Sequence, residues 1–270
     1  MNRIRLTRRI ALLAVHVLIG LLLTPLAAVR RPHGGWRTHH AVSSWWHNRL
    51  TDILGVAVSV SGTRPVAPAL LACNHISWLD IIVLGGLTHT DFLSKEEVRR
   101  WPLIGWLAAR AGTLFIRRGQ GQAGSVSEQI AARLRAGDML TLFPEGTTTV
   151  GREVRPFFSR LFAAAIDTGT AVVPVTLRYH VDGGHDPVAP YTGDQSLLDN
   201  LRGLLRRERT TVHVVFGQPL AAQGMTRRAL AEQARAAVLE PLQEPLPPAA
   251  QPRRPDWAGP VDLATDRRGA

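Results

Sequence analysis

From about residue 55 to residue 242, short apolar runs with the two-residue period of a strand alternate with longer stretches of helical period. The runs that predict strands are 56–61, 69–73, 92–95, 113–118, 139–143, 171–178 and 211–216. The stretches that predict helices are 78–84, 96–100, 102–110, 125–135, 157–168, 195–207 and 226–242. This alternation predicts an α/β fold, a mixed sheet flanked by helices on both faces, with functional residues on the loops at strand ends.

Glycine and proline punctuate this pattern. Gly85-Gly86 predicts the end of the helix that begins near residue 78. Pro174 lies inside the predicted strand 171–178, and because proline lacks a backbone N–H it predicts an edge strand or a bulge. Residues 182–194, rich in Gly, Asp and Pro, predict a loop. The composition of residues 243–270 predicts a disordered tail.

An uncharged stretch of twenty residues, Ile10 to Val29, lies between two groups of arginines, namely Arg3, Arg5, Arg8 and Arg9 before it and Arg30 and Arg31 after it. At about 1.5 Å per residue, a helix of this length could cross a hydrocarbon core of roughly 30 Å. Because both flanks are cationic, the stretch either crosses or lies with both ends at one surface. A signal peptide cleaved after Leu26-Ala27-Ala28 is the alternative. The arginines just beyond that site disfavour export, so we expect a retained membrane-associated helical segment.

The stretch from Thr38 to Leu54 has apolar residues, including Trp45 and Trp46, at mostly helical spacing. An amphipathic helix at the membrane interface and an ordinary helix packed on the core both fit this pattern. Its histidines are expected at the surface or against headgroups, since no Cys or Glu completes a metal-ligand set. We therefore expect three regions: a membrane anchor and amphipathic helix over 1–54, a catalytic domain over 55–242 and the tail over 243–270.

The formal net charge of the chain is +11, and residues 1–50 supply eight arginines and no acid, which leaves +3 for the rest. A basic excess around an apolar segment fits attraction to anionic lipid headgroups better than binding of nucleic acid. The single cysteine, Cys73, cannot form an internal disulfide, so nothing requires an oxidising compartment.

A histidine and a carboxylate five residues apart, His75 and Asp80, follow the predicted strand 69–73. A carboxylate bonded to one ring nitrogen fixes the histidine tautomer and stabilises the imidazolium, so the pair can act as a general base. Positions five apart on one helix point about 140° apart, so His75 must precede the helix. Ser77 is then the expected N-cap, and Asp80 resembles the second member of a capping box. The competing interpretation is that Asp80 only caps the helix and His75 is a satisfied loop histidine.

Two other groups compete with this pair for a catalytic role. His47 and Asp52 have the same spacing but lie in the amphipathic stretch without a preceding strand, so we interpret them as coincidence. Cys73 is an alternative nucleophile, which its position inside a predicted strand disfavours.

Two further segments offer substrate contacts at strand ends. The segment from Phe143 to Thr149 has the sequence Phe-Pro-Glu-Gly-Thr-Thr-Thr and can hold a polar headgroup with backbone N–H and hydroxyl donors. Taken alone, it is better explained as a plain turn that caps the next helix. The strand 113–118 ends in Arg117 and Arg118, whose guanidinium groups suit phosphate recognition. Because a strand alternates, only one of the two is expected to reach a site.

Together these segments resemble the four motif blocks of the glycerophospholipid acyltransferase family, in order and approximate spacing. The blocks are His75-x4-Asp80, residues 112–118, residues 143–147 and Val172-Val173-Pro174-Val175. The resemblance covers about residues 56–217. Bacterial 1-acylglycerol-3-phosphate acyltransferases are typical members, and lyso-ornithine lipid acyltransferases carry very similar blocks, including an Asn-His-x-Ser-Trp-Leu-Asp form of the first.

The resemblance implies transfer of a fatty acyl group to the free hydroxyl of a lysophospholipid, with His75 as the base and Asp80 orienting it. It further implies substrate-binding roles for Arg118, Glu145, Gly146, Thr147, Lys95 and Pro174, the last on the acyl-donor or structural side of the site. Arg117 stands where many relatives carry an acidic residue. The acceptor is therefore left open between 1-acylglycerol-3-phosphate, which is favoured, and lyso-ornithine lipid or another lyso-lipid.

The expected partners are the lipid acceptor, acyl-CoA or acyl-carrier protein as co-substrate, and the membrane surface, with no nucleic acid, metal or further cofactor. The expected place is the cytoplasmic face of the bacterial inner membrane, where such thioesters are found. Two other classes remain open: a membrane-bound lipid-binding protein that has lost catalysis, and an exported soluble protein. The presence of His75, Asp80, Glu145 and Gly146 argues against the first of these.

Overall fold

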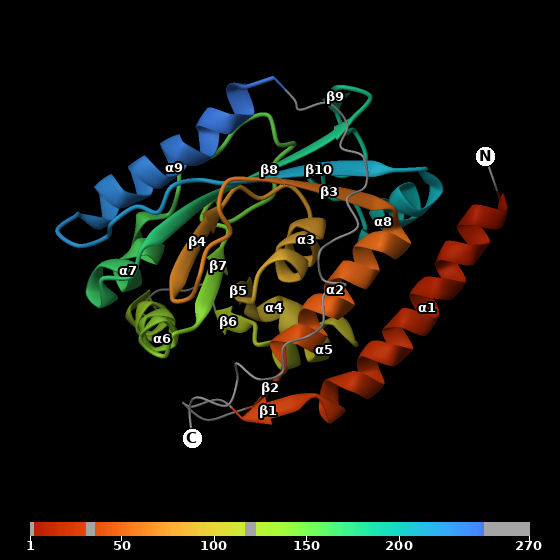
Figure 1. Ribbon diagram of the computed structural model, residues 1–270, viewed down its shortest axis with the longest axis horizontal. Coiled ribbons are helices and arrows are strands. Elements are labelled where there is room, and N and C mark those ends of the chain that lie inside the picture. Colours follow the sequence, from red (N-terminus) through yellow and green to blue (C-terminus); the bar gives the residue numbers. More distant parts are fainter. Residues whose placement is uncertain (1–2, 31–35, 117–122, 246–270) are drawn as a thin grey trace.

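The computed structural model describes residues 3–30, 36–116 and 123–245. At its centre lies one mixed sheet with the strand order β3-β10-β8-β4-β7-β5-β6, and β9 pairs with β8 (Figure 1). Its strands are β3 (Val56–Ser61), β4 (Ala69–Cys73), β5 (Thr90–Lys95), β6 (Leu114–Ile116), β7 (Met139–Leu142), β8 (Val172–Val181), β9 (Gly184–His185) and β10 (Thr210–Phe216). Strands β8, β4, β7, β5 and β6 run parallel, whereas β10 runs antiparallel to β8. The predicted α/β fold with a mixed sheet is confirmed.

Helices cover both faces of this sheet (Figure 1). The helices are α1 (Arg3–Leu26), α2 (His40–Leu54), α3 (Leu79–Leu87), α4 (Glu96–Arg99), α5 (Ile104–Ala111), α6 (Ala123–Arg135), α7 (Ala163–Thr168) with a 3-10 turn (Ser159–Phe162) before it, α8 (Leu197–Arg206) and α9 (Arg227–Gln243). Residues of α2, α3 and α8 share one core with the sheet, and residues of α6, α7 and α9 share the other.

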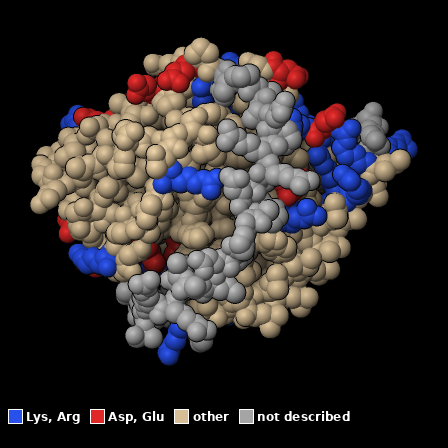
Figure 2. All heavy atoms as spheres, viewed as in Figure 1, with Lys and Arg blue, Asp and Glu red and all other residues tan. Residues whose placement is uncertain are grey.

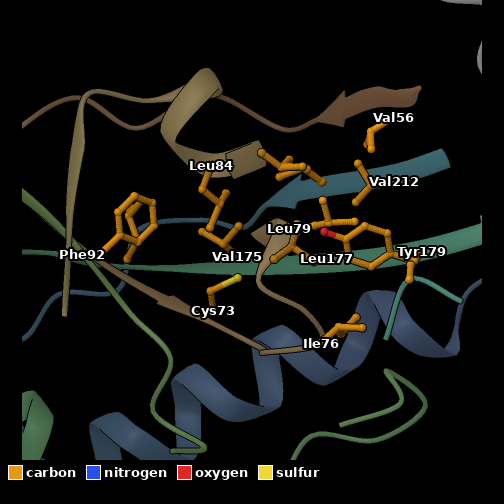
Figure 3. Packing of buried hydrophobic residues seen from close by; sticks show 14 of the residues in the cluster. Val56, Cys73, Ile76, Leu79, Leu84, Phe92, Val175, Leu177, Tyr179 and Val212 are labelled. Atoms are coloured by element: carbon orange, nitrogen blue, oxygen red, sulfur yellow. The ribbon is translucent and has the colours of Figure 1, made fainter. Parts of the chain in front are cut away.

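Strand β4 contributes to both cores because successive side chains of a strand point to opposite faces. Leu71 and Cys73 belong to the core under α2 and α3, whereas Leu70 and Ala72 belong to the core under α6 and α9. Figure 3 shows Cys73 in the first of these cores beside Val175. Burial on both faces explains why this strand reads as a continuous apolar run.

Helix α3 differs from its prediction because it continues through Gly85 and Gly86 to Leu87. The two glycines allow α2 to pack closely against α3. A Cβ atom on Gly85 would lie 3.1 Å from the ring of His47, and one on Gly86 would collide with Oδ1 of Asn48. The predicted stop is therefore wrong, since this glycine pair serves a close approach between helices rather than a helix end.

Pro174 was expected at an edge or bulge, yet β8 lies between β4 and β10 in the middle of the sheet. The carbonyl of Pro174 accepts a hydrogen bond from Gly217 N at 2.9 Å, on the side of β10. The last pair of the β8–β10 ladder is Val175 and Phe216, so Pro174 lies one residue outside the ladder. The N–H that proline lacks would therefore point beyond the last regular ladder bond. A central strand tolerates proline there because no regular ladder bond is lost.

Helix α2 packs on the core, which decides between its two interpretations. Leu50 and Leu54 belong to the same core as β4 and α3, although both precede the expected domain boundary at residue 55. His47 is only 8% exposed, and its Nδ1 lies 2.8 Å from the carbonyl oxygen of Ser43. The expectation that the histidines of this stretch lie at the surface or against headgroups is thus wrong for His47, because this histidine lies on the face that packs against α3.

Before α2, strands β1 (Ala28–Arg30) and β2 (Trp36–Thr38) form a small antiparallel pair that the sequence did not predict. Strands of three residues are too short to show a period. Helix α1 ends just before this pair and lies along α2, α5 and α8 (Figure 1).

The fully buried residues of α1 are polar or small, namely Arg9, His16, Gly20 and Thr24, while Leu6 and Leu13 are partly buried against the core. Two guanidinium nitrogens of Arg9 donate to the carbonyls of Arg207 at 2.6 Å and Glu208 at 3.0 Å. The opposite face is exposed and apolar, with Ile4, Ile10, Leu12, Val15, Leu18, Leu22 and Leu26. The outward face of α1 is therefore apolar, unlike the outward face of an ordinary surface helix.

Candidate active site

Strand β4 ends at Cys73, and the next residue fixes the start of the loop that carries His75. The buried side chain of Asn74 pairs with the backbone of Leu177 in β8: its Nδ2 donates to the Leu177 carbonyl at 3.0 Å, and its Oδ1 accepts from Leu177 N at 2.8 Å. These two hydrogen bonds extend the contact between β4 and β8 by one residue, through a side chain instead of the backbone. His75 consequently leaves the sheet from a fixed point.

The carboxylate of Asp80 is fully buried and holds His75 from the first turn of α3. Its Oδ2 accepts from His75 Nδ1 at 2.8 Å, from Ile76 N at 2.7 Å and from Ser77 N at 2.9 Å. One oxygen of Asp80 therefore both caps the helix start and orients the histidine. Ser77 was expected as the N-cap, but its side chain makes no capping hydrogen bond and Trp78 occupies that position.

Tyr179 supports Asp80 from β8, across 99 positions of sequence. Its hydroxyl donates to Asp80 Oδ1 at 2.9 Å. Burial, followed by the nearby Asp80 carboxylate, raises the pKa of Tyr179 well above its usual value, so this hydroxyl remains a donor. Figure 3 shows the ring within the core, close to Leu79 and Leu177. Sequence reasoning missed this residue, because only strand pairing brings it to the dyad.

Glu145 lies after β7 and ties two loops together. Its Oε1 accepts from His75 N and its Oε2 accepts from Arg155 N, both at 2.8 Å. Burial raises the pKa of this carboxyl, and the two backbone N–H donors oppose the shift. Both oxygens thus face backbone groups of the protein, so the structure places Glu145 as a link behind His75.

The ring of His75 stacks on Phe143, with ring centroids 4.0 Å apart and planes inclined by 18°. Its side chain is 19% exposed, whereas Asp80 has no exposed surface. With Nδ1 bonded to Asp80, the other ring nitrogen, Nε2, is the one that can meet a substrate. Within the described ranges no protein group is hydrogen-bonded to Nε2. The pair therefore has the arrangement of a general base, with an oriented imidazole and one nitrogen left for a hydroxyl.

The other predicted residues reach this site to different degrees. Because β4, β7, β5 and β6 are parallel, their carboxyl ends share one edge of the sheet. Gly146, with a φ of 71°, and the exposed Thr147 follow Glu145 at that edge, and Lys95 ends β5 there in register with Ile116. Pro174 is buried in the sheet opposite Ala72. Arg117 and Arg118 lie outside the described residues.

Neither Cys73 nor the pair of His47 and Asp52 is arranged for catalysis. Cys73 is fully buried, and burial raises the pKa of its thiol well above the usual value, with Asp80 and Glu145 adding to the shift. A thiol in this state is a poor nucleophile. Asp52 pairs with Arg49 at 3.8 Å rather than with His47. Across the ranges that the structure describes, no three His, Cys, Asp or Glu side chains are grouped so that they could hold a metal ion.

Residues 56–178 match the family described as Acyltransferase. The chain is 45% identical over 241 residues to the lyso-ornithine lipid O-acyltransferase of Pseudomonas aeruginosa, covering 88% of this chain and 93% of that protein. It is 36% identical over 247 residues to the protein of the same name from Rhodobacter capsulatus, covering 88% and 90%.

Similarity to the 1-acyl-sn-glycerol-3-phosphate acyltransferase of Neisseria meningitidis is lower, at 32% over 166 residues, covering 60% of this chain and 65% of that protein. The crystal structure of the 1-acyl-sn-glycerophosphate acyltransferase PlsC from Thermotoga maritima superposes with a TM-score of 0.56 at 21% identity, covering 75% of this chain and 78% of that one. At that identity the likeness is one of fold.

Proposed function

The chain belongs to the acyltransferase family, and we propose that it moves a fatty acyl group from acyl-CoA or acyl-carrier protein to the free hydroxyl of a lyso-ornithine lipid. The observation that carries acyl transfer is the His75–Asp80 pair, with Nδ1 held at 2.8 Å and Nε2 directed away from Asp80. The acceptor is assigned from the relatives. Two lyso-ornithine lipid O-acyltransferases align over about nine-tenths of their length, whereas the 1-acyl-sn-glycerol-3-phosphate acyltransferase from Neisseria meningitidis aligns over 65%. Of the two acceptors that the sequence left open, lyso-ornithine lipid therefore takes precedence.

In the proposed reaction, Nε2 of His75 takes the proton of the acceptor hydroxyl while the hydroxyl oxygen bonds to the thioester carbonyl carbon. The tetrahedral intermediate then loses the thiolate as the carbon–sulfur bond breaks. The imidazolium returns its proton to the leaving sulfur, so that the products are the acylated lipid and a free thiol. Such proton transfer contributes typically about 10²–10⁴-fold in rate.

Asp80 serves this cycle by holding Nδ1–H and stabilising the imidazolium. Its other hydrogen bonds, from Ile76 N, Ser77 N and the Tyr179 hydroxyl, hold the carboxylate in place. No acyl-enzyme is required, which is consistent with the buried state of Cys73.

The chain is associated with a membrane, and we propose that α1 lies within the interface rather than across it. Among the described helices, α1 alone is long and apolar enough to span a bilayer. Its buried face is bonded to the domain through Arg9 and through a pair of bonds between His16 and Trp46. Its outer face presents seven apolar side chains to the surroundings. Spanning would break the first set of contacts, whereas lying flat keeps both.

The charge distribution agrees with this placement. Figure 2 shows Lys and Arg side chains gathered at the N-terminal end of α1, beside the uncharged length of the helix. Cationic residues beside an interfacial apolar face bind anionic headgroups. We place the catalytic domain on the cytoplasmic face of the inner membrane, because the acyl donors are cytoplasmic. An uncleaved N-terminus in the inner-membrane fraction is expected, and a processed soluble form would contradict this placement.

The function is tested with the purified full-length protein in vesicles that contain either lyso-ornithine lipid or 1-acylglycerol-3-phosphate, with acyl-CoA and acyl-carrier protein each as donor. We expect turnover with lyso-ornithine lipid, and a loss of at least about 10²-fold in His75→Ala. Circular dichroism should show this variant folded, because the imidazole is partly exposed and the backbone bonds of residue 75 remain.

Each other outcome has a separate meaning. Turnover confined to 1-acylglycerol-3-phosphate would overturn the acceptor assignment and leave the family assignment intact. Lipid binding without release of thiol from either donor would identify a lipid-binding protein without catalysis. Full activity in His75→Ala would show that another group removes the proton.

A further inference from the structure

Between β5 and β6 the chain forms the short helices α4 and α5, and the turn that joins them exposes large apolar side chains. Trp101, Leu103, Ile104 and Trp106 are each 39–53% exposed, and all four lie within residues 101–106. Single apolar residues are common on protein surfaces, whereas a group of this size marks a surface that binds a protein or a membrane. We call residues 101–106 the apolar turn.

The backbone of the apolar turn holds these side chains outward. Ile104 N donates to the carbonyl of Pro102 at 2.7 Å, and Leu103 between them has a φ of 61°. A positive φ is unusual for leucine, and such a conformation persists where the surrounding structure holds it. Gly105 is buried next to it, and a Cβ atom there would collide with the carbonyl oxygen of Arg99. The exposure of Leu103 and Ile104 is therefore fixed by the fold.

Cationic side chains flank the apolar turn. Residues 95–110 contain one lysine and three arginines against two glutamates, a net charge of +2. Glu96 pairs with Arg99 at 3.7 Å, and the guanidinium carbon of Arg110 lies 5.8 Å from the ring centre of Trp106. Tryptophan is enriched where a protein meets the headgroups of a bilayer, and arginine is attracted to anionic headgroups. The composition of this segment thus fits an anionic lipid surface.

The apolar turn belongs to an element that neighbours α1. Helix α5 packs against α1 and against β2, and the β1–β2 pair directly follows the C-terminal end of α1 (Figure 1). The exposed apolar side chains of α1 extend to that end, with Leu18, Leu22 and Leu26. A bilayer that binds this end of α1 therefore has the α4–α5 insertion as its neighbour.

The insertion also borders the candidate active site. Helix α4 begins at Glu96, directly after the carboxyl end of β5, which is the edge of the sheet that carries the loops of His75 and Glu145. A stack of rings connects this strand to the base. The ring centre of Phe92 in β5 lies 6.4 Å from that of Phe143, which lies 4.0 Å from that of His75. A membrane bound to the insertion would thus lie near this edge.

We propose that the apolar turn is a second membrane-binding element, which inserts into the headgroup region of an anionic bilayer beside α1. A single helix lying on a bilayer leaves the domain free to rotate about the helix axis. A second contact, on the insertion after β5, stops this rotation and keeps the edge with His75 toward the lipid. The inference adds to the proposed placement of α1 and does not depend on the identity of the acceptor.

A fluorescent label at residue 103 tests the contact directly. The single cysteine of the chain, Cys73, is fully buried, so Leu103→Cys can be labelled selectively with an environment-sensitive dye. The labelled full-length protein is mixed with vesicles of phosphatidylglycerol and phosphatidylethanolamine that contain a nitroxide-bearing lipid as quencher. We expect the emission to shift to the blue and to be quenched. The same dye on Val66→Cys, an exposed position on the β3–β4 loop, should not respond.

A third label separates this proposal from the placement of α1. The dye on Leu18→Cys reports the outer face of α1. A response at residue 18 without one at residue 103 overturns the proposal and leaves the placement of α1 intact. No response at either residue contradicts both. If the label at residue 103 responds to acyl-carrier protein and not to vesicles, the apolar turn is a protein-docking surface and the proposal is overturned.

A charge at Ile104 measures how much the apolar turn contributes to binding. Ile104 is the first residue of α5, where a carboxylate suits the helix dipole, so circular dichroism should show Ile104→Asp folded. We expect this variant to bind the same vesicles about tenfold more weakly in flotation assays, because an apolar side chain is lost from the bilayer. Val66→Asp is the control and should bind as wild type does. Equal binding of Ile104→Asp and wild type would overturn the proposal.

Discussion

Replacing Glu145 by glutamine separates a positioning role from a substrate-binding role at the same residue. In the structure both carboxylate oxygens accept backbone N–H groups, one from His75 and one from Arg155, each at 2.8 Å. Glutamine keeps one acceptor oxygen and turns an N–H₂ group toward the other backbone N–H. Two donors then face each other in a site where residue 145 is 4% exposed.

The expected loss of stability follows from these contacts. Hydrogen bonds to charged groups are worth about 1.5–3 kcal/mol, and one is lost in Glu145→Gln. The neutral side chain recovers part of this, because burial disfavours the carboxylate and raises the pKa of Glu145. We expect the free energy of unfolding to fall by about 1–3 kcal/mol, which lowers Tm by roughly 3–10 °C in a domain of this size.

The effect on catalysis should appear in kcat. Glu145 holds the backbone of His75, and a displacement of about 1 Å in a catalytic group can cost about 100-fold. We expect kcat to fall about 10- to 100-fold while KM for the acceptor changes less than about twofold. Steady-state kinetics with varied acceptor, together with thermal unfolding by circular dichroism, measure both quantities. Glu153→Gln is the matched control, since Glu153 is exposed and should alter neither.

The opposite kinetic result would refute this reasoning. If Glu145→Gln raised KM for the acceptor at unchanged kcat and unchanged Tm, the carboxylate would contact the lipid, as the family resemblance implies. A loss of uniform binding has that signature, whereas a loss of positioning does not.

Three other substitutions test separate parts of the structure. Tyr179→Phe leaves Asp80 Oδ1 without its donor, so the free energy of unfolding should fall by about 1.5–3 kcal/mol. The loss of kcat should be smaller than in His75→Ala. Unchanged stability in urea unfolding would contradict the hydrogen bond. Burial lowers the pKa of His47 from 6.5 to about 4 in the folded protein. As pH falls from about 6.5 to 4, the unfolded chain therefore gains a proton on His47 that the folded protein does not, and the free energy of unfolding decreases. Wild type should therefore lose about 3 kcal/mol more than His47→Gln over that range in pH-dependent urea unfolding, and parallel curves would refute it. Leu18→Asp should lower binding to anionic vesicles about tenfold or more in flotation assays. Val66→Asp, an exposed control on the β3–β4 loop, should bind as wild type does. Equal binding of wild type and both variants would place the membrane interface elsewhere.

The alternation of strands and helices could be predicted because each element has its own period. Where the prediction was wrong, a contact distant in sequence decided the outcome. Gly85 and Gly86 read as a helix stop, but they are continuous with α3 because α2 packs onto them. Pro174 read as an edge residue, but the β10 ladder ends just where its N–H is missing. Neither contact leaves a local signal in the chain.

The candidate site likewise combines residues that a local pattern predicts with residues that only distant contacts bring together. The pair His75 and Asp80 was visible from spacing and context, since both belong to one loop and one helix start. The groups that hold this pair come from elsewhere: Tyr179 from β8 and Glu145 from the end of β7. The resemblance drew attention to Glu145, but its bonds to backbone N–H groups follow only from the fold.

The double duty of Asp80 bears on how this protein could change over evolutionary time. One oxygen begins α3 and holds His75, so loss of the carboxylate removes a helix cap together with the base. Loss of the imidazole leaves that cap in place. A duplicated copy that drifts toward lipid carriage without chemistry should therefore lose His75 first and keep Asp80. An aspartate without its histidine would mark such a descendant as folded and catalytically silent.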